Sequence, residues 1–167
     1  TTEIYTLSLH DALPILINEE LKAAVIQDLV LMSCVGINTV LVHGGGPEIE
    51  AMLRRLNIES RFIGGLRYTD AQTIEVVQMV LCGKLNKDIV SLIGNAGGKA
   101  LGLCGLDGGL LRAVRLKTGG EDLGFVGEIS SVDPAPLLNA LGDGYIPVVS
   151  TLAQGTGNDE GITFNIN

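Results

Sequence analysis

Three consecutive glycines are the residues of this sequence best placed to do chemistry. Gly44, Gly45 and Gly46 stand between a short apolar run and Pro47, a residue that favours the first turn of a helix. Backbone amides without side chains can approach a ligand closely, and the amino-terminal end of a helix adds partial positive charge. The turn is neither a Walker A loop nor Gly-x-Gly-x-x-Gly, so a dinucleotide is not indicated. The triple-glycine turn instead predicts a site for a phosphoryl group or a carboxylate. The alternative interpretation is that the glycines only allow a tight turn that needs positive φ.

A candidate partner for this turn is Arg67, which follows the glycine pair Gly64 and Gly65. A guanidinium group can hold a carboxylate through two parallel hydrogen bonds. If both turns lie at the same edge of a sheet, Arg67 and the triple-glycine turn can hold the two ends of one dicarboxylate. The alternative is a surface arginine that pairs with an Asp or a Glu.

A weaker candidate stands at the end of the chain, where Asn165 and Asn167 share one face of an expected strand. Two side-chain amides on one face can bind an amide or a carboxylate of a ligand. The alternative is a turn, in which asparagine is common.

The remaining chemistry-bearing side chains are predicted to be structural. His43 ends an expected strand, and no Ser or carboxylate stands at a spacing that would complete a triad. Lys84 and Lys87 are three residues apart, which is typical of a solvated helix face. The three cysteines lack metal-type spacing and stand among apolar residues, which favours reduced core residues and an intracellular setting. None of these side chains is therefore predicted to be catalytic or to bind a metal ion.

The elements that must position these residues are helices alternating with short apolar strands. We expect helices from Asn18 to Gly36 and over 47–56, 71–82, 84–93 and 133–141, strands over 39–42, 100–103 and 145–150, and a hairpin of 110–114 with 125–129. Thr69 to Gln72 has the form of a capping box. Pro147 favours an edge or an end of its strand. The alternation predicts an α/β fold with an open, mainly parallel sheet sandwiched between helices, and a ligand at the carboxyl ends of the strands.

The composition excludes several classes of function. The chain has 167 residues, enough for one domain with a real core, and a formal net charge of −8. That charge and an aromatic content of 4% are unfavourable for binding nucleic acid or an anionic membrane. No apolar run reaches the roughly 18 residues of a membrane span. We therefore expect a small-molecule ligand and neither a nucleic-acid nor a membrane partner.

The chain divides at about residue 15. Residues 1–15 show no clean period, and Pro14 interrupts the only short helix that they would form, so we interpret them as a segment foreign to the rest of the chain. The alternative is an ordinary amino-terminal strand and turn. Residues 16–167 are predicted to form the ligand-binding part.

Five linked stretches carry a resemblance to a known family: VLVHGGGPEIEAMLRRLNI, GLRYTD, VLCGKLNKDIVSLI, LGFVGEI with GYIPVVS, and TFNIN. In this order and spacing, residues 18–167 resemble the N-acetyl-L-glutamate kinases of the amino acid kinase family. The resemblance implies transfer of the γ-phosphoryl group of MgATP to the side-chain carboxylate of N-acetyl-L-glutamate. It further implies arginine biosynthesis in the cytoplasm, or in a plastid for a plant source, by a homo-oligomeric enzyme.

Carried over to this sequence, the resemblance makes 16–167 the acetylglutamate-binding part of an amino acid kinase domain. It implies that Gly45 and Gly46 lie against the acyl-phosphate end and that Arg67 holds the α-carboxylate. It also implies that Asn165 contacts the acetylglutamate, and that a hairpin within 110–129 covers it.

The sequence departs from that family at both ends. The family's opening strand, with a Lys and a Gly-rich loop, should precede Glu19, where this chain has DALPILIN. The nucleotide-binding half, with a second catalytic Lys, should follow Asn167. We therefore expect a fragment that is inactive by itself and binds neither ATP nor Mg²⁺ firmly. The alternatives are another amino acid kinase, of the carbamate or uridylate kinase type, and a non-catalytic module that binds a small acid.

Overall fold

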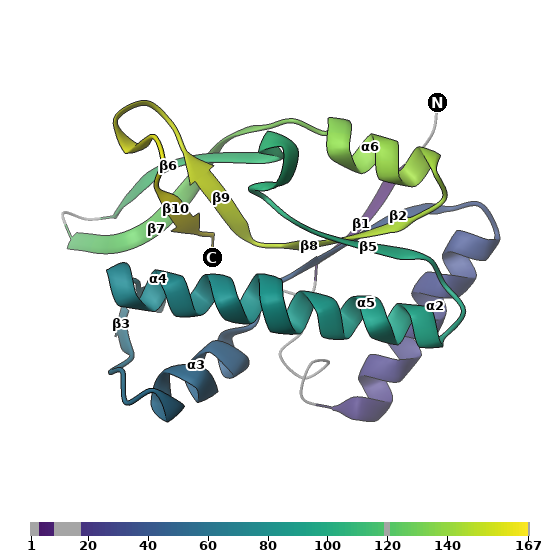
Figure 1. The fold of residues 1–167 in the computed structure, drawn as a ribbon, viewed down its shortest axis with the longest axis horizontal. Helices are drawn as coiled ribbons and strands as arrows, with labels where there is room; N and C mark the ends of the chain where they lie inside the picture. Colours follow the sequence, from purple (N-terminus) through teal and green to yellow (C-terminus); the bar gives the residue numbers. More distant parts are fainter. Residues whose placement is uncertain (1–3, 9–17, 119–120, 167) are drawn as a thin grey trace.

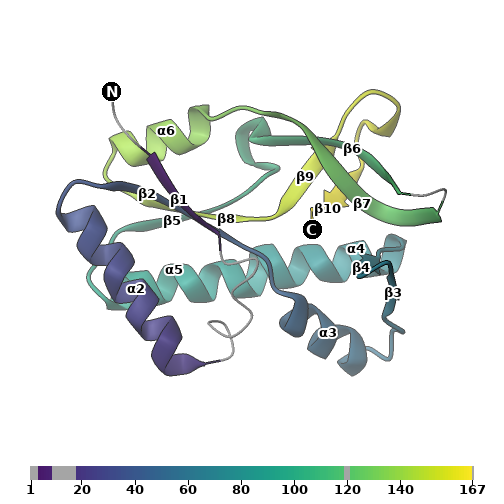
Figure 2. The same cartoon turned by 180° about the vertical axis from the view of Figure 1, so that it is seen from behind.

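The fold combines a parallel sheet, helices on both of its faces and a small β-barrel (Figures 1 and 2). The computed structural model describes residues 4–8, 18–118 and 121–166. The sheet has the order β1-β2-β8-β5, and all of its pairs are parallel. Its strands are β1 (Ile4–Ser8), β2 (Asn38–His43), β8 (Ile146–Ser150) and β5 (Ala100–Cys104). The predicted α/β class is confirmed.

Two helix layers cover the sheet. Helices α2 (Glu19–Cys34) and α5 (Asn86–Asn95) pack on one face, and α6 (Ala135–Gly142) packs on the other (Figure 1). The strands alternate accordingly: Leu41 and Val148 join the core under α2 and α5, whereas Val40 and Val149 belong to the cluster under α6. Runs that are apolar on both faces therefore form the middle of this sheet, as expected for buried parallel strands.

Local signals fix the first two helices. The Asn18 side chain caps α2 by accepting 3.0 Å hydrogen bonds from the backbone N–H groups of Glu20 and Leu21. Gly36, at φ 84°, follows the end of the helix. Helix α3 (Gly46–Arg55) begins beside Pro47. The predictions for both helices are confirmed.

One long helix replaces the two that the sequence predicts over 71–82 and 84–93. Helix α4 (Ala71–Gln78) continues through a π-helical turn (Met79–Leu85) into α5 without a break (Figure 1). The prediction of a break at Gly83 is wrong, because the wider turn carries the chain past this glycine while it buries Leu81 and Leu85. The cap is Asp70, whose carboxylate accepts from the N–H of Thr73 at 2.8 Å. Thr69 is not the cap, because its backbone pairs with strand β7 (Glu121–Val132).

Strand β8 lies in the middle of the sheet, so an edge position for it is wrong. Pro147 is the second residue of the strand, as the alternative of a strand end predicts. It is tolerated because β8 pairs with β2 only from Val148 onward, so no ladder on that side requires an N–H at Pro147. At one edge of the sheet, Ile4–Ser8 pair with β2 as strand β1, the arrangement expected of an ordinary amino-terminal strand. Residues 9–15 lie outside the described part.

The barrel consists of β6 (Leu111–Thr118), β7 (Glu121–Val132), β9 (Leu152–Gly155) and β10 (Thr163–Asn165). Strands β6 and β7 form the predicted hairpin and are longer than expected. A short hairpin of β3 (Arg61–Ile63) and β4 (Leu66–Tyr68) leads into α4. Two 3₁₀ turns, Asp107–Gly109 and Gly157–Asp159, complete the described elements.

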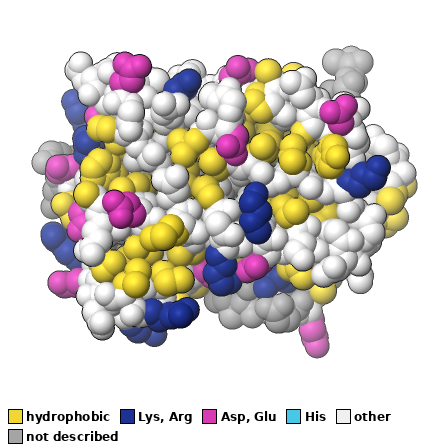
Figure 3. All heavy atoms as spheres, in the orientation of Figure 1, with side chains coloured by type: hydrophobic (Ala, Val, Ile, Leu, Met, Phe, Trp, Pro, Cys, Tyr) yellow, Lys and Arg dark blue, Asp and Glu magenta, His cyan; other side chains and the backbone are white. Residues whose placement is uncertain are grey.

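Exposed apolar side chains come from many elements of the fold. On the face seen in Figure 3 they form several separate areas with charged side chains between them. They come from different elements, among them Leu31 of α2, Val114 of β6 and Leu138 of α6. In the part of the chain that the structure describes, no helix is both long and apolar enough to cross a bilayer.

Candidate functional site

The triple-glycine turn lies at the carboxyl edge of the sheet, where the sequence predicts a ligand. His43 ends β2 and is in register with Ser150 at the end of β8, which is in register with Cys104 at the end of β5. Gly44 and Gly45 follow His43 directly, and α3 starts at the next residue. The dipole of α3 therefore points its positive end at this edge.

The three glycines are not explained by backbone geometry, since none of them has a positive φ in the left-handed region. A Cβ on Gly45 would stand 2.6 Å from Leu85 Cδ2 and 2.8 Å from Leu81 Cδ2, so this glycine is needed for close packing on the π-helical turn. A Cβ on Gly44 or Gly46 would meet no described atom within 4 Å. The open space at these two positions fits a ligand that approaches the backbone.

Arg67 reaches the same corner. Its Nη2 lies 3.4 Å from the carbonyl oxygen of Gly46, and its side chain is almost completely buried. Nη1 donates to Glu50 Oε2 at 2.9 Å and to Ser60 Oγ, and the guanidinium lies over the ring of Phe62 at 4.7 Å from the centroid. The structure therefore brings together the cation and the glycine turn that the sequence singles out.

Arg67 also has the acidic partner that the alternative interpretation predicts, although it is not a surface residue. The hydrogen bond from Arg67, followed by that from Ser60, lowers the pKa of Glu50, so this carboxylate stays ionised. Glu50 and Ser60 occupy Nη1 only. Among the described residues, Nε of Arg67 has no hydrogen-bond partner. The Nε edge of the guanidinium can therefore meet a ligand carboxylate while Glu50 holds the other edge.

Asn165 is buried on β10, between β7 and β9. Strand β10 packs against α4, the helix that follows β4, the strand that contains Arg67. Asn165 thus belongs to the barrel side of the region around α4. Asn167, the other predicted amide, lies outside the described residues.

His43 is a structural residue, as predicted. It is fully buried, and burial lowers its pKa, so the ring is neutral at pH 7. Because Asn86 can only donate through Nδ2, the 3.1 Å contact makes His43 Nε2 an acceptor. Nδ1 then carries the proton and donates to the carbonyl oxygen of Gly44 at 2.9 Å. This imidazole orients the first peptide of the glycine turn.

Sequence reasoning missed Asn86, which joins three strands. Its Nδ2 also lies within hydrogen-bond distance of the carbonyl oxygens of Val148 at 2.9 Å and Leu103 at 3.2 Å, so its two hydrogens are shared among three acceptors. The signal was an asparagine next to Leu85 on the apolar face of a helix, where a polar residue needs buried partners. The neighbouring Lys87 is exposed, as predicted, and its ammonium group also donates to Asn86 Oδ1 at 3.0 Å and Gly102 O at 3.2 Å. Lys84 is exposed, pairing with Asp88 at 2.8 Å.

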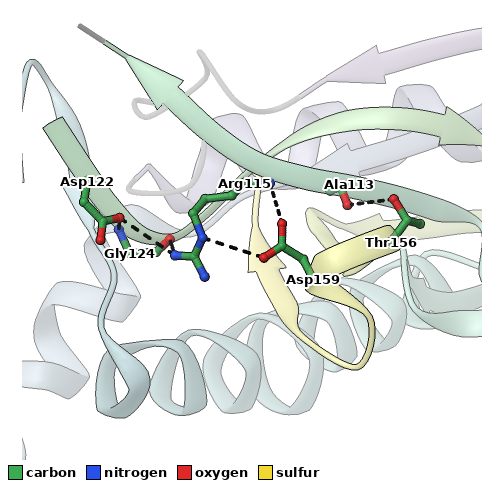
Figure 4. Close-up of polar contacts among 6 residues, drawn as sticks. All are labelled: Ala113, Arg115, Asp122, Gly124, Thr156 and Asp159. Carbon is green, nitrogen blue, oxygen red and sulfur yellow. Dashed lines mark hydrogen bonds and ion pairs between the residues drawn. The ribbon is translucent and has the colours of Figure 1, made fainter. Parts of the chain in front are cut away.

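A second arginine fastens the β6–β7 hairpin (Figure 4). The Arg115 guanidinium donates to the carbonyl oxygen of Gly124 and lies 3.8 Å from carboxylate oxygens of both Asp122 and Asp159. Gly124 has φ 72°, and a Cβ there would stand 2.1 Å from the carbonyl oxygen of Thr69. Backbone hydrogen bonds at 3.0 and 2.6 Å join Thr69 to the residues on either side of Gly124. The hairpin is therefore attached two residues after Arg67.

Other potential ligands are dispersed. Within the described residues, no group of three or more His, Cys, Asp and Glu side chains could hold a metal ion. The prediction that all three cysteines are core residues is wrong for Cys34, which is exposed on α2. Cys104 is buried and Cys82 is half-buried.

Comparison with known proteins assigns the family. The amino acid kinase family profile matches residues 15–167. The chain belongs to the amino acid kinase family. A protein of Clostridium kluyveri named acetylglutamate kinase is 55% identical over 152 residues, which are 91% of this chain and 52% of that protein. A protein of the same name from Carboxydothermus hydrogenoformans is 56% identical over 160 residues, 91% of this chain and 53% of its own length. This amino acid kinase chain spans about half the length of the curated relatives that it matches.

Solved structures share the fold. The protein smu.665 of Streptococcus mutans aligns with a TM-score of 0.79 at 20% identity, over 98% of this chain and 62% of that one. An N-acetylglutamate synthase of Neisseria gonorrhoeae, complexed with coenzyme A and N-acetyl-glutamate, aligns with a TM-score of 0.74 at 22% identity, over 98% and 36%. These matches support the amino acid kinase fold of this chain.

Proposed function

We propose that this chain is the acetylglutamate-binding part of an acetylglutamate kinase. The reaction transfers the γ-phosphoryl group of ATP to the side-chain carboxylate of N-acetyl-L-glutamate, a step of arginine biosynthesis in the cytoplasm. The observation that carries the proposal is the convergence of the buried guanidinium of Arg67 on Gly46, at 3.4 Å. The names of relatives above 50% identity support the choice of substrate.

The proposed ligand is a dicarboxylate with one acyl-amide group, and the corner offers a different group to each end. The Nε edge of Arg67 holds the α-carboxylate, while Glu50 and Ser60 hold the opposite edge and prevent the guanidinium from rotating. The open backbone at Gly44 and Gly46 receives the side-chain carboxylate and the phosphoryl group that it accepts. Asn165 contributes its amide to the acetylglutamate.

No residue of this corner needs to remove a proton. The attacking group is a carboxylate, which is already ionised at pH 7, so positioning and charge stabilisation carry the reaction. The neutral, buried His43 fits this requirement, because it orients Gly44 and is not poised as a base. The amides of the turn and the α3 dipole stabilise negative charge on the transferred group.

MgATP is the cosubstrate in this proposal. The triphosphate would meet the sheet edge at the side-chain-free positions Gly44 and Gly46, which fit a group that contacts backbone amides. The β6–β7 hairpin, held by Arg115 and joined to Thr69, covers the acetylglutamate. Covering the ligand excludes water from the acyl phosphate.

Isothermal titration of the purified chain with N-acetyl-L-glutamate, carbamate and UMP tests the proposal. We expect saturable heat with N-acetyl-L-glutamate alone. Saturable binding of carbamate or UMP in its place would favour the carbamate or uridylate kinase alternative. Circular dichroism and a cooperative thermal transition confirm that the chain is folded; a folded chain that binds none of the three compounds would refute the proposal.

A further inference from the structure

Two thiols from different elements meet beside the triple-glycine turn. Cys104 ends β5, in register with Ser150 of β8, and Cys82 belongs to the π-helical turn. The Cys82 thiol lies 3.3 Å from Ser150 Oγ, and Ser150 is the residue in register with Cys104, so the two cysteines flank the same serine. The pair therefore bridges the sheet edge and the long helix, whereas Cys34 is exposed on α2.

The surroundings make the two thiols unequal. The hydrogen bond from Cys104, assisted by that from Ser150, lowers the pKa of Cys82 to about 7. The same contact and burial raise the pKa of Cys104. The charged groups close to the pair are the Lys87 ammonium, which favours the Cys82 thiolate, and the Asp107 carboxylate, which opposes it and accepts the Cys104 N–H at 2.7 Å.

This inequality is the one that oxidation of a thiol pair requires. A half-buried thiol that is partly ionised near neutral pH is a nucleophile towards peroxide. A protonated, buried thiol in contact with it can resolve the first product. A disulfide places its sulfur atoms at about 2.05 Å, so the two thiols beside Ser150 must approach each other for the bond to form.

We propose that Cys82 and Cys104 form a peroxide-sensitive modification site that closes to a disulfide and is reopened by a dithiol. The Cys82 thiolate attacks one oxygen of hydrogen peroxide: an S–O bond forms, the O–O bond breaks, and the departing hydroxide takes a proton to become water. Cys104 then gives up its proton and attacks the Cys82 sulfur, so that the S–S bond forms, the S–O bond breaks and a second water leaves. Two thiols and one peroxide give one disulfide and two waters; the sulfur atoms are oxidised and the peroxide oxygens are reduced.

The test treats the reduced full chain with hydrogen peroxide and follows intact mass and peptide maps. We expect the native chain to lose two hydrogen atoms, a linked Cys82–Cys104 peptide to appear, and dithiothreitol to restore the original mass. The matched control Cys34→Ser should behave like the native chain. Cys104→Ser should instead retain one oxygen on Cys82 that dimedone captures, and Cys82→Ser should form no internal disulfide.

A pH series separates this site from ordinary oxidation. The rate at Cys82 should reach half of its plateau near pH 7, and the exposed Cys34 provides the comparison in the same samples. Circular dichroism confirms that each variant is folded. Oxidation confined to Cys34, or oxidation of Cys82 that ends in sulfinic acid without the linked peptide, would overturn the proposal. The site does not depend on the proposed kinase function, since none of these measurements requires a substrate.

Discussion

Single alanine substitutions in the triple-glycine turn should separate packing from ligand binding. In Gly45→Ala, the new Cβ would stand 2.6 Å from Leu85 Cδ2 and 2.8 Å from Leu81 Cδ2, so both leucines must move. Overpacking of this kind costs about 1–3 kcal/mol. A domain of this size loses roughly 2–4 °C of melting temperature per kcal/mol, so we expect the Tm to fall by about 2–12 °C.

Gly44→Ala and Gly46→Ala should behave in the opposite way. A Cβ at either position meets no described atom within 4 Å, and neither glycine has a positive φ. We expect the free energy of unfolding to change by no more than about 0.5 kcal/mol. The added methyl group would, however, block close approach of the ligand to the backbone. Losing one charge-assisted hydrogen bond of about 1.5–3 kcal/mol should raise the Kd for N-acetyl-L-glutamate roughly 10- to 150-fold.

Thermal unfolding and isothermal titration on the three variants together provide the test. Each variant is the matched control of the others, because all three make the same chemical change within three consecutive residues. Native affinity in both Gly44→Ala and Gly46→Ala would refute the placement of a ligand at this turn. A native Tm in Gly45→Ala would refute the packing explanation for that glycine.

Three further predictions address neighbouring features. Arg67→Lys should weaken N-acetyl-L-glutamate binding at least about tenfold in titrations, because an ammonium group cannot hold a carboxylate through two parallel hydrogen bonds. The control is Arg55→Lys, at an exposed arginine of α3. Equal affinities of the two variants would contradict the binding role of Arg67. Asp70→Ala should cost about 1 kcal/mol near pH 7 in urea unfolding. The hydrogen bond from the Thr73 N–H lowers the pKa of Asp70, so the stabilisation by this cap is present above the unfolded-state pKa and is lost as the pH falls through the folded-state pKa. The free-energy cost of Asp70→Ala should therefore shrink near pH 3. A cost that stays constant with pH would contradict this role of Asp70. Asn86→Leu should lower the free energy of unfolding by roughly 3 kcal/mol or more in the same assay, because it leaves buried acceptors unpaired. The control is Asn139→Leu, at an exposed asparagine. Equal destabilisation by the two substitutions would refute the structural role of Asn86.

Local signals were sufficient for most elements of the fold. Asn18 caps α2 and Pro47 lies in the first turn of α3, as their positions in the sequence predict. The apolar runs became the buried strands of a parallel sheet, and its carboxyl edge follows from the topology. Arg67 does not follow from that rule, because it lies within β4 of a separate antiparallel hairpin and reaches the glycine turn through tertiary packing.

The features that were missed depend on contacts between distant segments. Asn86 reaches acceptors that are 17, 43 and 62 residues away in sequence, and no local pattern encodes these distances. The helix passes Gly83 because burial of Leu81 and Leu85 outweighs the low helix propensity of one glycine.

The binding roles of Gly45, Gly46, Arg67 and Asn165 stay predictions until ligand binding is measured.

The attachment of the β6–β7 hairpin at Thr69 limits how a ligand can enter. Lifting the whole hairpin would break the hydrogen bonds at 3.0 and 2.6 Å on either side of Gly124, together with the contact of Arg115 to the same residue. Gly124 lies near the tip of the hairpin, where Thr118 pairs with Glu121, so the attachment at Thr69 fixes the outer end of the hairpin. Because this attachment stands two residues from Arg67, we expect a ligand that binds the guanidinium to restrain the hairpin as well.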